Sequence, residues 1–346
     1  MTNFPLSMEA QQLAEQLEII DLHLDTLIPF RLWGYNPLTR HSWMPFGRHF
    51  FTHTDVPRLR EGGVTAGMWS ITTNPLRPAN NRWQIFLRNL IQLQRLCDAS
   101  KGNLHLARNH AEYLIGREKG AMIVLPAIQG ANAISGAKEG VFAIPHNMIT
   151  RMTLVHLTSS IYGNTSSPFH WLNPFKGLKV AGKTLIEQMN EKHIFVDLAH
   201  AHPQTFWDAV DVHDKTHPLL VTHTGVDGAR KHWRNLDDKQ IKAIADTGGV
   251  IGIMFATNFL QAPKGSTDSN MIIDHLEHLI NVGGESIAAI GSDFDGAISP
   301  PKDLYTALHY PRLIQRMLDR HWKIDRIKAV LGENFLRVFK EYRSNV

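Results

Sequence analysis

Eight short apolar segments, separated by longer segments of mixed polarity, constrain the fold of this chain most strongly. Each is rich in Val, Ile, Leu or Met, and a continuous apolar run of this length is typical of a strand buried on both faces of a parallel sheet. The predicted strands are 19–25, 65–72, 121–128, 152–156, 194–200, 219–223, 250–255 and 288–293.

The segments between these strands carry the apolar periodicity of helices. Pro203 suits the first turn of one such helix, and Gly248 with Gly249 suits the end of another. Alternation of strands and helices indicates parallel βα units, and eight units indicate a closed barrel. The clearest predicted helices are 83–99, 182–192, 203–213, 237–247 and 270–282.

No Pro- or Ser-rich linker divides the 346 residues, so we predict a single α/β domain over 1–346 with a (β/α)₈ TIM-type barrel. The segment 158–182, between the fourth and fifth predicted strands, is rich in Ser, Asn, Pro and aromatic residues. We expect this segment to form a loop over the mouth of the barrel.

Composition excludes several classes of protein. The net charge is +4, the Lys and Arg residues are scattered, and no nucleic acid-reading motif accompanies them, which argues against a nucleic acid partner. The single cysteine, Cys97, follows Leu90, Leu93 and Leu96 at helical spacing, which favours a buried structural thiol. Because no apolar run reaches about 18 residues and no signal peptide pattern is present, we expect a soluble cytoplasmic protein without membrane attachment.

Polar residues stand where several of the buried strands end. An unpaired buried polar group costs about 1–3 kcal/mol, so such residues need a reason to be there. His23 and Asp25 lie two residues apart on one strand and therefore share a face. The other candidates at strand ends are His156, His200, His223 and Asp293.

These strand ends share the carboxyl-terminal rim, where barrel enzymes assemble their sites. Imidazole and carboxylate ligands suit zinc and similar divalent metals, so the set predicts a metal site. A single histidine in a chain with 20 of them is more often an ordinary core or rim residue. Asp21 and Asp197 stand earlier in their motifs and are expected to anchor loops or support the ligands.

The order HxD, His, His, Asp along the strands is the pattern of the metal-dependent amidohydrolase superfamily. Within it, the chain resembles the membrane (renal-type) dipeptidase family from residue 20 to about 338. The matching motifs are IDLHLD (20–25), RMTLVH (151–156), VDLAH (196–200), VTHT (221–224), RNLDD (234–238), GSDFDG (291–296) and GENFLR (332–337).

The resemblance implies a binuclear zinc enzyme that hydrolyses dipeptides with a metal-held hydroxide. It assigns His23, Asp25 and Asp293 to one ion, His200 and His223 to the other, proton transfer to Asp293, the oxyanion to His156 and the substrate carboxylate to Arg234. It also names a homodimer as a candidate assembly. Two other interpretations stay open: His156 as a hydrogen-bond donor of the rim, and Arg234 as a surface charge beside Arg230.

One position departs from the family. Gln129 stands where the family has a glutamate that bridges both metals, and an amide cannot bridge through two oxygens. We therefore expect one tight ion at His23, Asp25 and Asp293, and a loose or absent second ion. Three functions stay open: a metallodipeptidase with one or two zinc ions, a related amidohydrolase acting on another amide, lactam or ester, and a binding barrel with weak or lost catalysis.

Overall fold

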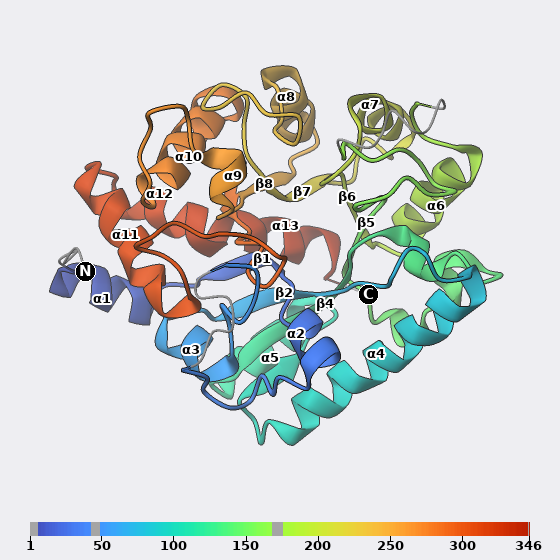
Figure 1. Cartoon of the computed structure of the whole chain (residues 1–346), viewed down its shortest axis with the longest axis horizontal. Coiled ribbons are helices and arrows are strands. Elements are labelled where there is room, and N and C mark those ends of the chain that lie inside the picture. The colour runs from blue at the N-terminus through green and yellow to red at the C-terminus, as the bar shows by residue number, and fades with distance from the viewer. Residues whose placement is uncertain (1–5, 43–48, 168–175, 345) are drawn as a thin grey trace.

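A closed barrel of eight parallel strands forms the centre of the molecule, as expected for a (β/α)₈ fold (Figure 1). The computed structural model describes residues 6–42, 49–167, 176–344 and 346. Around the barrel the strand order is β1-β2-β4-β5-β6-β7-β8-β9, and β9 pairs with β1 to close it. The strands are β1 Ile20–Leu24, β2 Ala66–Ile71, β4 Met122–Ile128, β5 Arg151–Thr153, β6 Phe195–Asp197, β7 Leu220–Thr224, β8 Val250–Ile253 and β9 Ala288–Ile290.

A ninth strand, β3 (Leu104–Leu106), was not expected from the sequence. It pairs in parallel with the first residues of β4, while β5 pairs with the last two, Ala127 and Ile128. The strand therefore flanks the barrel without belonging to its wall. Three residues are too few to show an apolar run, which explains why the sequence did not reveal it.

Helices surround the barrel and cover its outer apolar face (Figure 1). All five of the clearest sequence predictions are helices, with α4 starting four residues earlier than expected and α8 capped by Asp237. None of the helices in the described ranges is long and apolar enough to cross a membrane. The helices are α1 Met8–Gln16, α2 Leu27–Trp33, α3 Val56–Glu61, α4 Ala79–Ala99, α5 His110–Glu118, α6 Val180–Glu191, α7 Pro203–Val212, α8 Asp238–Asp246, α9 Thr257–Leu260, α10 Asn270–Gly283, α11 Tyr310–Asp319, α12 Ile324–Lys328 and α13 Asn334–Tyr342.

Helix α13 packs its aromatic side chains against the start of the barrel strands. Phe195, the first residue of β6, has its ring 6.1 Å from Phe335, 6.5 Å from Phe339 and 4.8 Å from Tyr342, measured between ring centroids. These rings belong to an apolar cluster with interior residues of β1, β2 and β4. The amino-terminal end of the barrel is therefore filled with apolar side chains.

Several strands are shorter than the sequence suggested. β5, β6 and β9 end at Thr153, Asp197 and Ile290, so the predicted strand-end residues lie on the loops that follow. His200 and Asp293 have φ angles of 65° and 62°, a left-handed backbone conformation that a continuing strand does not allow. Non-glycine residues held in this way cluster at functional sites.

The described residues of the segment 158–182 form no strand, with 168–175 outside the described part, and helix α6 begins within the segment at Val180, two residues before the predicted start of that helix. Ser166 donates its N–H to the carbonyl of His200 at 2.7 Å, and Thr165 forms an isolated bridge with Ala201. The described part of this segment therefore lies against the loop that carries His200, at the carboxyl-terminal end of the barrel.

Candidate metal centre

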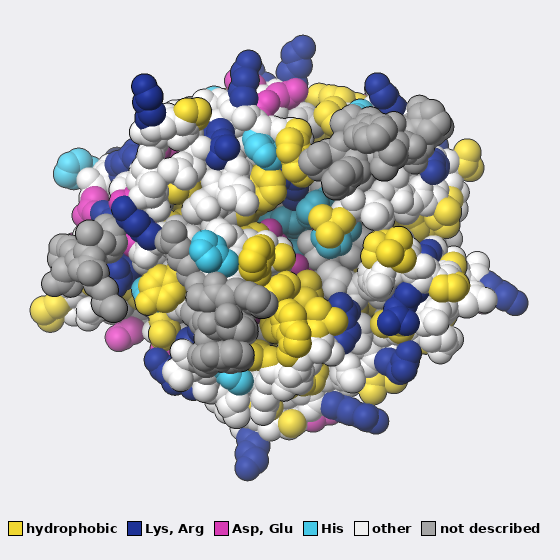
Figure 2. Space-filling view, viewed as in Figure 1, with side chains coloured by type: hydrophobic (Ala, Val, Ile, Leu, Met, Phe, Trp, Pro, Cys, Tyr) yellow, Lys and Arg dark blue, Asp and Glu magenta, His cyan; other side chains and the backbone are white. Residues whose placement is uncertain are grey.

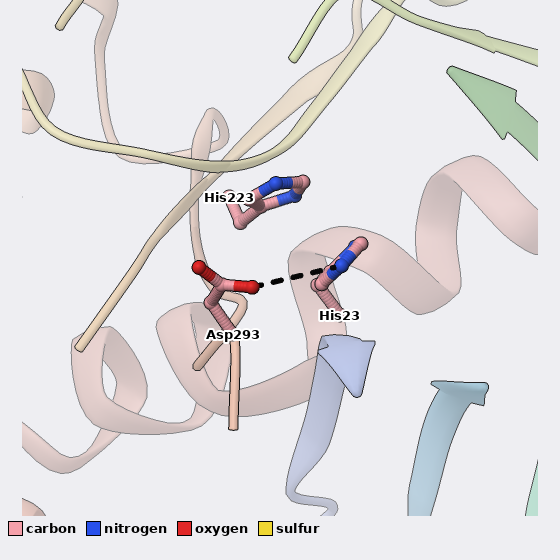
Figure 3. Close-up of side chains that lie close together, drawn as sticks. All are labelled: His23, His223 and Asp293. Atoms are coloured by element: carbon pink, nitrogen blue, oxygen red, sulfur yellow. Dashed lines mark ion pairs between the residues drawn. The ribbon is translucent and has the colours of Figure 1, made fainter. Parts of the chain in front are cut away.

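The carboxyl ends of β1 and β7 and the loop after β9 bring His23, His223 and Asp293 together (Figure 3). One ligand atom from each of these buried side chains lies within 4.8 Å of the other two. In the space-filling view, a hollow near the middle of this face shows histidine and acidic side chains on its floor and hydrophobic side chains on its rim (Figure 2). The structure thus unites strand-end residues that lie up to 270 positions apart in the sequence.

His23 and Asp25 face the same side of the barrel wall, as their spacing predicted. The Nε2 atom of His23 lies 3.7 Å from Asp25 Oδ2 and 3.8 Å from Asp293 Oδ1. The pairing of β1 with β2 shifts register between Asp21 and Leu24. Such irregularities re-aim side chains next to active sites, and here one accompanies the turn of His23 towards the interior.

His200 and His223 form the second pair of candidate ligands. Their Nε2 atoms lie 2.8 Å apart, and the ring centroids of His23 and His223 are 3.7 Å apart. The pairing of β7 with β8 also shifts register, between Val221 and Thr224, next to His223. The two pairs of ligands therefore lie side by side across the mouth of the barrel.

Gln129, which directly follows β4, lies between the ligands and is 2% exposed. With its amide nitrogen facing Asp25, the nitrogen donates to both carboxylate oxygens, at 3.1 and 3.2 Å. Its amide oxygen then accepts from Nε2 of His23 at 3.1 Å and from Nε2 of His156 at 3.3 Å. The side chain therefore lies among the candidate ligands as a hydrogen-bonded amide.

Arg234 is buried rather than a surface charge, with 5% of its surface exposed. Its Nη2 donates to the carbonyl of His223 at 2.8 Å, and the carboxylates of Asp293 and Asp197 act on its charge. This overturns the surface interpretation and leaves the guanidinium at the edge of the metal ligands.

His156 lies at the rim, where its ring is 4.8 Å from that of His200. Burial lowers the pKa of His156 to about 4, against the opposing effect of Asp25. The imidazole is therefore neutral at pH 7 and carries a single N–H that can be donated.

Asp21 and Asp197 support the site from below, as their early positions in the motifs suggested. Asp21 accepts from the backbone N–H groups of His23 at 3.0 Å and Ser292 at 2.8 Å. Asp197 accepts from both the N–H and the hydroxyl of Thr222, at 3.1 and 2.6 Å. Each carboxylate thus fixes the backbone beside a candidate ligand.

Arg151 is the residue that the sequence interpretation missed, although it begins a motif that was noted. It lies on the first position of β5 with no exposed surface, and its Nη1 lies 3.4 Å from Asp197 Oδ2. Its Nη2 lies 3.0 Å from both His23 Nδ1 and Ser70 Oγ. The feature of the sequence that could have identified Arg151 is a charged residue on an otherwise apolar buried strand.

The donor set suits a bound transition metal at this end of the barrel. Zinc bonds of about 2.0–2.1 Å in a tetrahedral arrangement put neighbouring ligand atoms roughly 3.4 Å apart. The separations of 2.8, 3.7 and 3.8 Å among His200, His223, His23, Asp25 and Asp293 bracket this value. Burial, and then the neighbouring Asp25, raise the pKa of Asp293 well above its ordinary value, as expected for carboxylates gathered without a cation.

Comparison with known proteins identifies the family and the fold of the chain. A family model described as membrane dipeptidase (peptidase family M19) matches residues 7–345. A solved structure titled dipeptidase AC, a metallopeptidase of family M19, shares 24% identity with a TM-score of 0.83, over 95% of this chain and 99% of that one.

Two further structures share the fold. A metallopeptidase from Rhodobacter sphaeroides, liganded with a phosphinate mimic of the dipeptide L-Ala-D-Ala, has 23% identity and a TM-score of 0.82, over 94% of this chain and 99% of that one. The probable dipeptidase PvdM from Pseudomonas aeruginosa has 13% identity and a TM-score of 0.86, over 98% of both chains.

Proposed function

Because the chain belongs to the membrane dipeptidase family, peptidase family M19, we propose that it is a zinc-dependent dipeptidase acting at the carboxyl end of its barrel. The observation that carries the proposal is the cluster of His23, His223 and Asp293, whose ligand atoms lie within 4.8 Å of one another. The related Rhodobacter enzyme, solved with a dipeptide mimic, supports a small peptide substrate.

The imidazole and carboxylate side chains of this cluster would hold the zinc. A bound zinc ion polarises a carbonyl and lowers the pKa of water from 15.7 to about 7. The buried position of the cluster favours this chemistry, because electrostatic interactions are stronger where water is excluded.

The chain's own residues complete the reaction. Arg234 offers a planar guanidinium, which matches the free carboxylate of a dipeptide with two parallel hydrogen bonds. The single N–H of neutral His156 donates to the Gln129 oxygen at 3.3 Å in this structure. With substrate bound it would turn to the oxygen of the scissile carbonyl as negative charge develops there. The resemblance assigns proton transfer to Asp293, whose carboxylate could take a proton from the attacking water and deliver it to the leaving amine.

A dipeptide panel combined with metal analysis tests the proposal. Purified protein dialysed against Zn²⁺ and then against buffer should retain zinc by elemental analysis and should hydrolyse free dipeptides. Chelation should remove both the zinc and the activity, and added Zn²⁺ should restore them. Protein that retains no divalent metal, or that holds zinc but cleaves no member of a broad L,L and L,D panel, would contradict it. A cytoplasmic location and a homodimer stay predictions from the sequence.

A further inference from the structure

Half of the barrel mouth is built from connections without acidic residues. The connections after β7 and β9 contain acids such as Asp227 and Asp303. Those that follow β1, β2, β4 and β5 contain no Asp or Glu over 26–54, 72–97, 129–138 and 156–186, although these two residue types make up 32 of the 346 positions. Beyond Asp25 at the end of β1, a substrate group over this half therefore meets neutral and cationic side chains.

Arg31 is a cation of this half whose charge reaches the metal ligands. It lies half-buried on α2, and its guanidinium donates to both the carbonyl and the hydroxyl of Thr72, the first residue after β2. Burial lowers the pKa of Arg31, the carboxylate of Asp25 opposes this shift, and the neighbouring Arg77 adds to it. The guanidinium is therefore close enough to the cluster to feel Asp25, yet no carboxylate of the described residues forms an ion pair with it.

Most of the hydrogen-bonding capacity of Arg31 is unused. A guanidinium has five N–H donors, and Thr72 takes two, so three have no acceptor among the described residues. Arg82 shows the contrast within the same half, because its donors are taken by Ser135 Oγ at 2.6 Å and by the carbonyls of Asn132 at 2.8 Å, Pro75 at 3.2 Å and residue 77. Arg82 ties loops together, whereas Arg31 keeps a planar fork that suits a carboxylate.

Arg31 and Arg234 lie on opposite sides of the mouth. In the closed ring of eight strands, β2 and β7 are four strands apart in either direction. Arg31 is bound to the end of β2 through Thr72, and Arg234 follows β7 and donates to the carbonyl of His223. If Arg234 binds the free carboxylate of a dipeptide and the scissile bond lies at the cluster, the amino-terminal residue of the substrate extends towards Arg31.

We propose that Arg31 binds a carboxylate on the side chain of the substrate's amino-terminal residue, so that the enzyme prefers dipeptides that begin with Glu or Asp. The inference deepens the proposed function and rests on it for the orientation of the substrate. An acidic side chain also offsets the ammonium group of the same residue, which the acid-free half of the mouth otherwise receives poorly. Arg31 is then a residue that determines specificity.

Four dipeptides test the proposal in wild-type protein: Glu-Ala, Gln-Ala, Ala-Glu and Ala-Gln. Glu and Gln have nearly the same shape, so each pair isolates the charge of one side chain. We expect kcat/KM for Glu-Ala to exceed that for Gln-Ala by about 10-fold or more, as a hydrogen-bonded charge pair gives, and Ala-Glu and Ala-Gln to differ little. Equal rates for Glu-Ala and Gln-Ala, or a preference for Ala-Glu over Ala-Gln instead, would overturn the proposal.

Arg31→Met removes the guanidinium and keeps much of the apolar stem. Its ratio of kcat/KM for Glu-Ala to that for Gln-Ala should fall to about 1. Arg88→Met is the matched control, because it removes the same charge from an exposed position of α4 within the same acid-free segment, and its ratio should equal that of wild type. If Arg31 only fastens α2 to Thr72, Arg31→Met lowers both rates by the same factor and keeps the ratio, which would overturn the proposal.

Binding to chelated protein separates this inference from the proposed function. Isothermal titration calorimetry without zinc compares Glu-Ala with Gln-Ala where no turnover is expected. Wild type should bind Glu-Ala more tightly, and Arg31→Met should bind both alike. If the protein holds no zinc and cleaves no dipeptide, the proposed function fails, while this measurement still decides the role of Arg31. If wild type hydrolyses neutral dipeptides but neither cleaves nor binds Glu-Ala in preference to Gln-Ala, the dipeptidase proposal stands and the Arg31 proposal is wrong.

Discussion

The two ends of the barrel are built on opposite physical principles. At the amino end, α13 fills the interior with Phe335, Phe339 and Tyr342, and the contacts are apolar. At the carboxyl end, loops that follow short strands hold histidines and carboxylates, two of them on left-handed backbone. The difference teaches that the core that stabilises this barrel and the site that gives it function occupy different layers, with Arg151 between them.

Loss of a metal ligand should give the largest effect and should be confined to the carboxyl end. We expect His223→Ala to lose bound zinc and at least about 10³-fold in kcat/KM, equivalent to ~4 kcal/mol of transition-state stabilisation. Elemental analysis and dipeptide hydrolysis measure this, with thermal unfolding of the metal-free proteins as the check on stability. A variant that keeps its zinc and its rate would show that His223 is not a ligand.

Truncation of an apolar side chain at the amino end should instead lower the stability of the fold and leave the metal site unchanged. Phe339 has no exposed surface, and its ring lies 5.6 Å from Phe335 and 6.5 Å from Phe195. Phe339→Ala should lower the free energy of unfolding by about 3–5 kcal/mol through lost burial and a residual cavity.

The zinc content and KM of the folded Phe339→Ala protein should stay unchanged. Lys340→Ala, at an exposed position of the same helix, is the matched control and should cost less than about 0.5 kcal/mol. Denaturant unfolding measures both variants. If Phe339→Ala also changes zinc affinity, the two ends are coupled and the comparison fails.

The fold was more predictable from the sequence than the site. Burial on both faces leaves a continuous apolar run, so the strands of the wall could be found, and HxD spacing put His23 and Asp25 on one face. The roles of Arg151 and Gln129 depend on which side chains share a layer inside the barrel, and the sequence does not fix this. Ala127 pairs with Arg151, and Gln129 lies two residues beyond Ala127, so only the register of β4 and β5 brings the two residues together.

A structural histidine outside the metal cluster should make stability depend on pH. Burial lowers the pKa of His275 to about 4, and both ring nitrogens are used by backbone groups. Between pH 6.5 and 4 the unfolded chain binds a proton that the folded chain refuses, so the free energy of unfolding falls as pH falls. A shift from 6.5 to about 4 corresponds to roughly 3 kcal/mol at the acid limit.

His275→Gln should keep both hydrogen bonds through its amide and should remove this part of the acid sensitivity. Thermal unfolding of wild type and variant between pH 4 and 7 gives the difference, and His321→Gln at an exposed position is the control. Parallel curves for wild type and His275→Gln would show that this imidazole is not kept neutral by the fold.

The smallest expected effect concerns substrate binding at the edge of the site. Arg234 is buried and already donates to the His223 carbonyl at 2.8 Å, so part of its guanidinium is used by the protein and the remaining N–H groups are left for a substrate carboxylate. Arg234→Lys keeps the charge but loses the planar fork. We expect KM for free dipeptides to rise about 10-fold, or ~1.4 kcal/mol, with kcat within about 3-fold, because this contact is made equally in the ground and transition states.

Dipeptide amides, which lack the carboxylate, should be poor substrates of wild type and should be affected little by the substitution. If free and amidated dipeptides lose the same factor, the guanidinium supports the His223 backbone instead of the substrate, and Arg234 then positions a ligand.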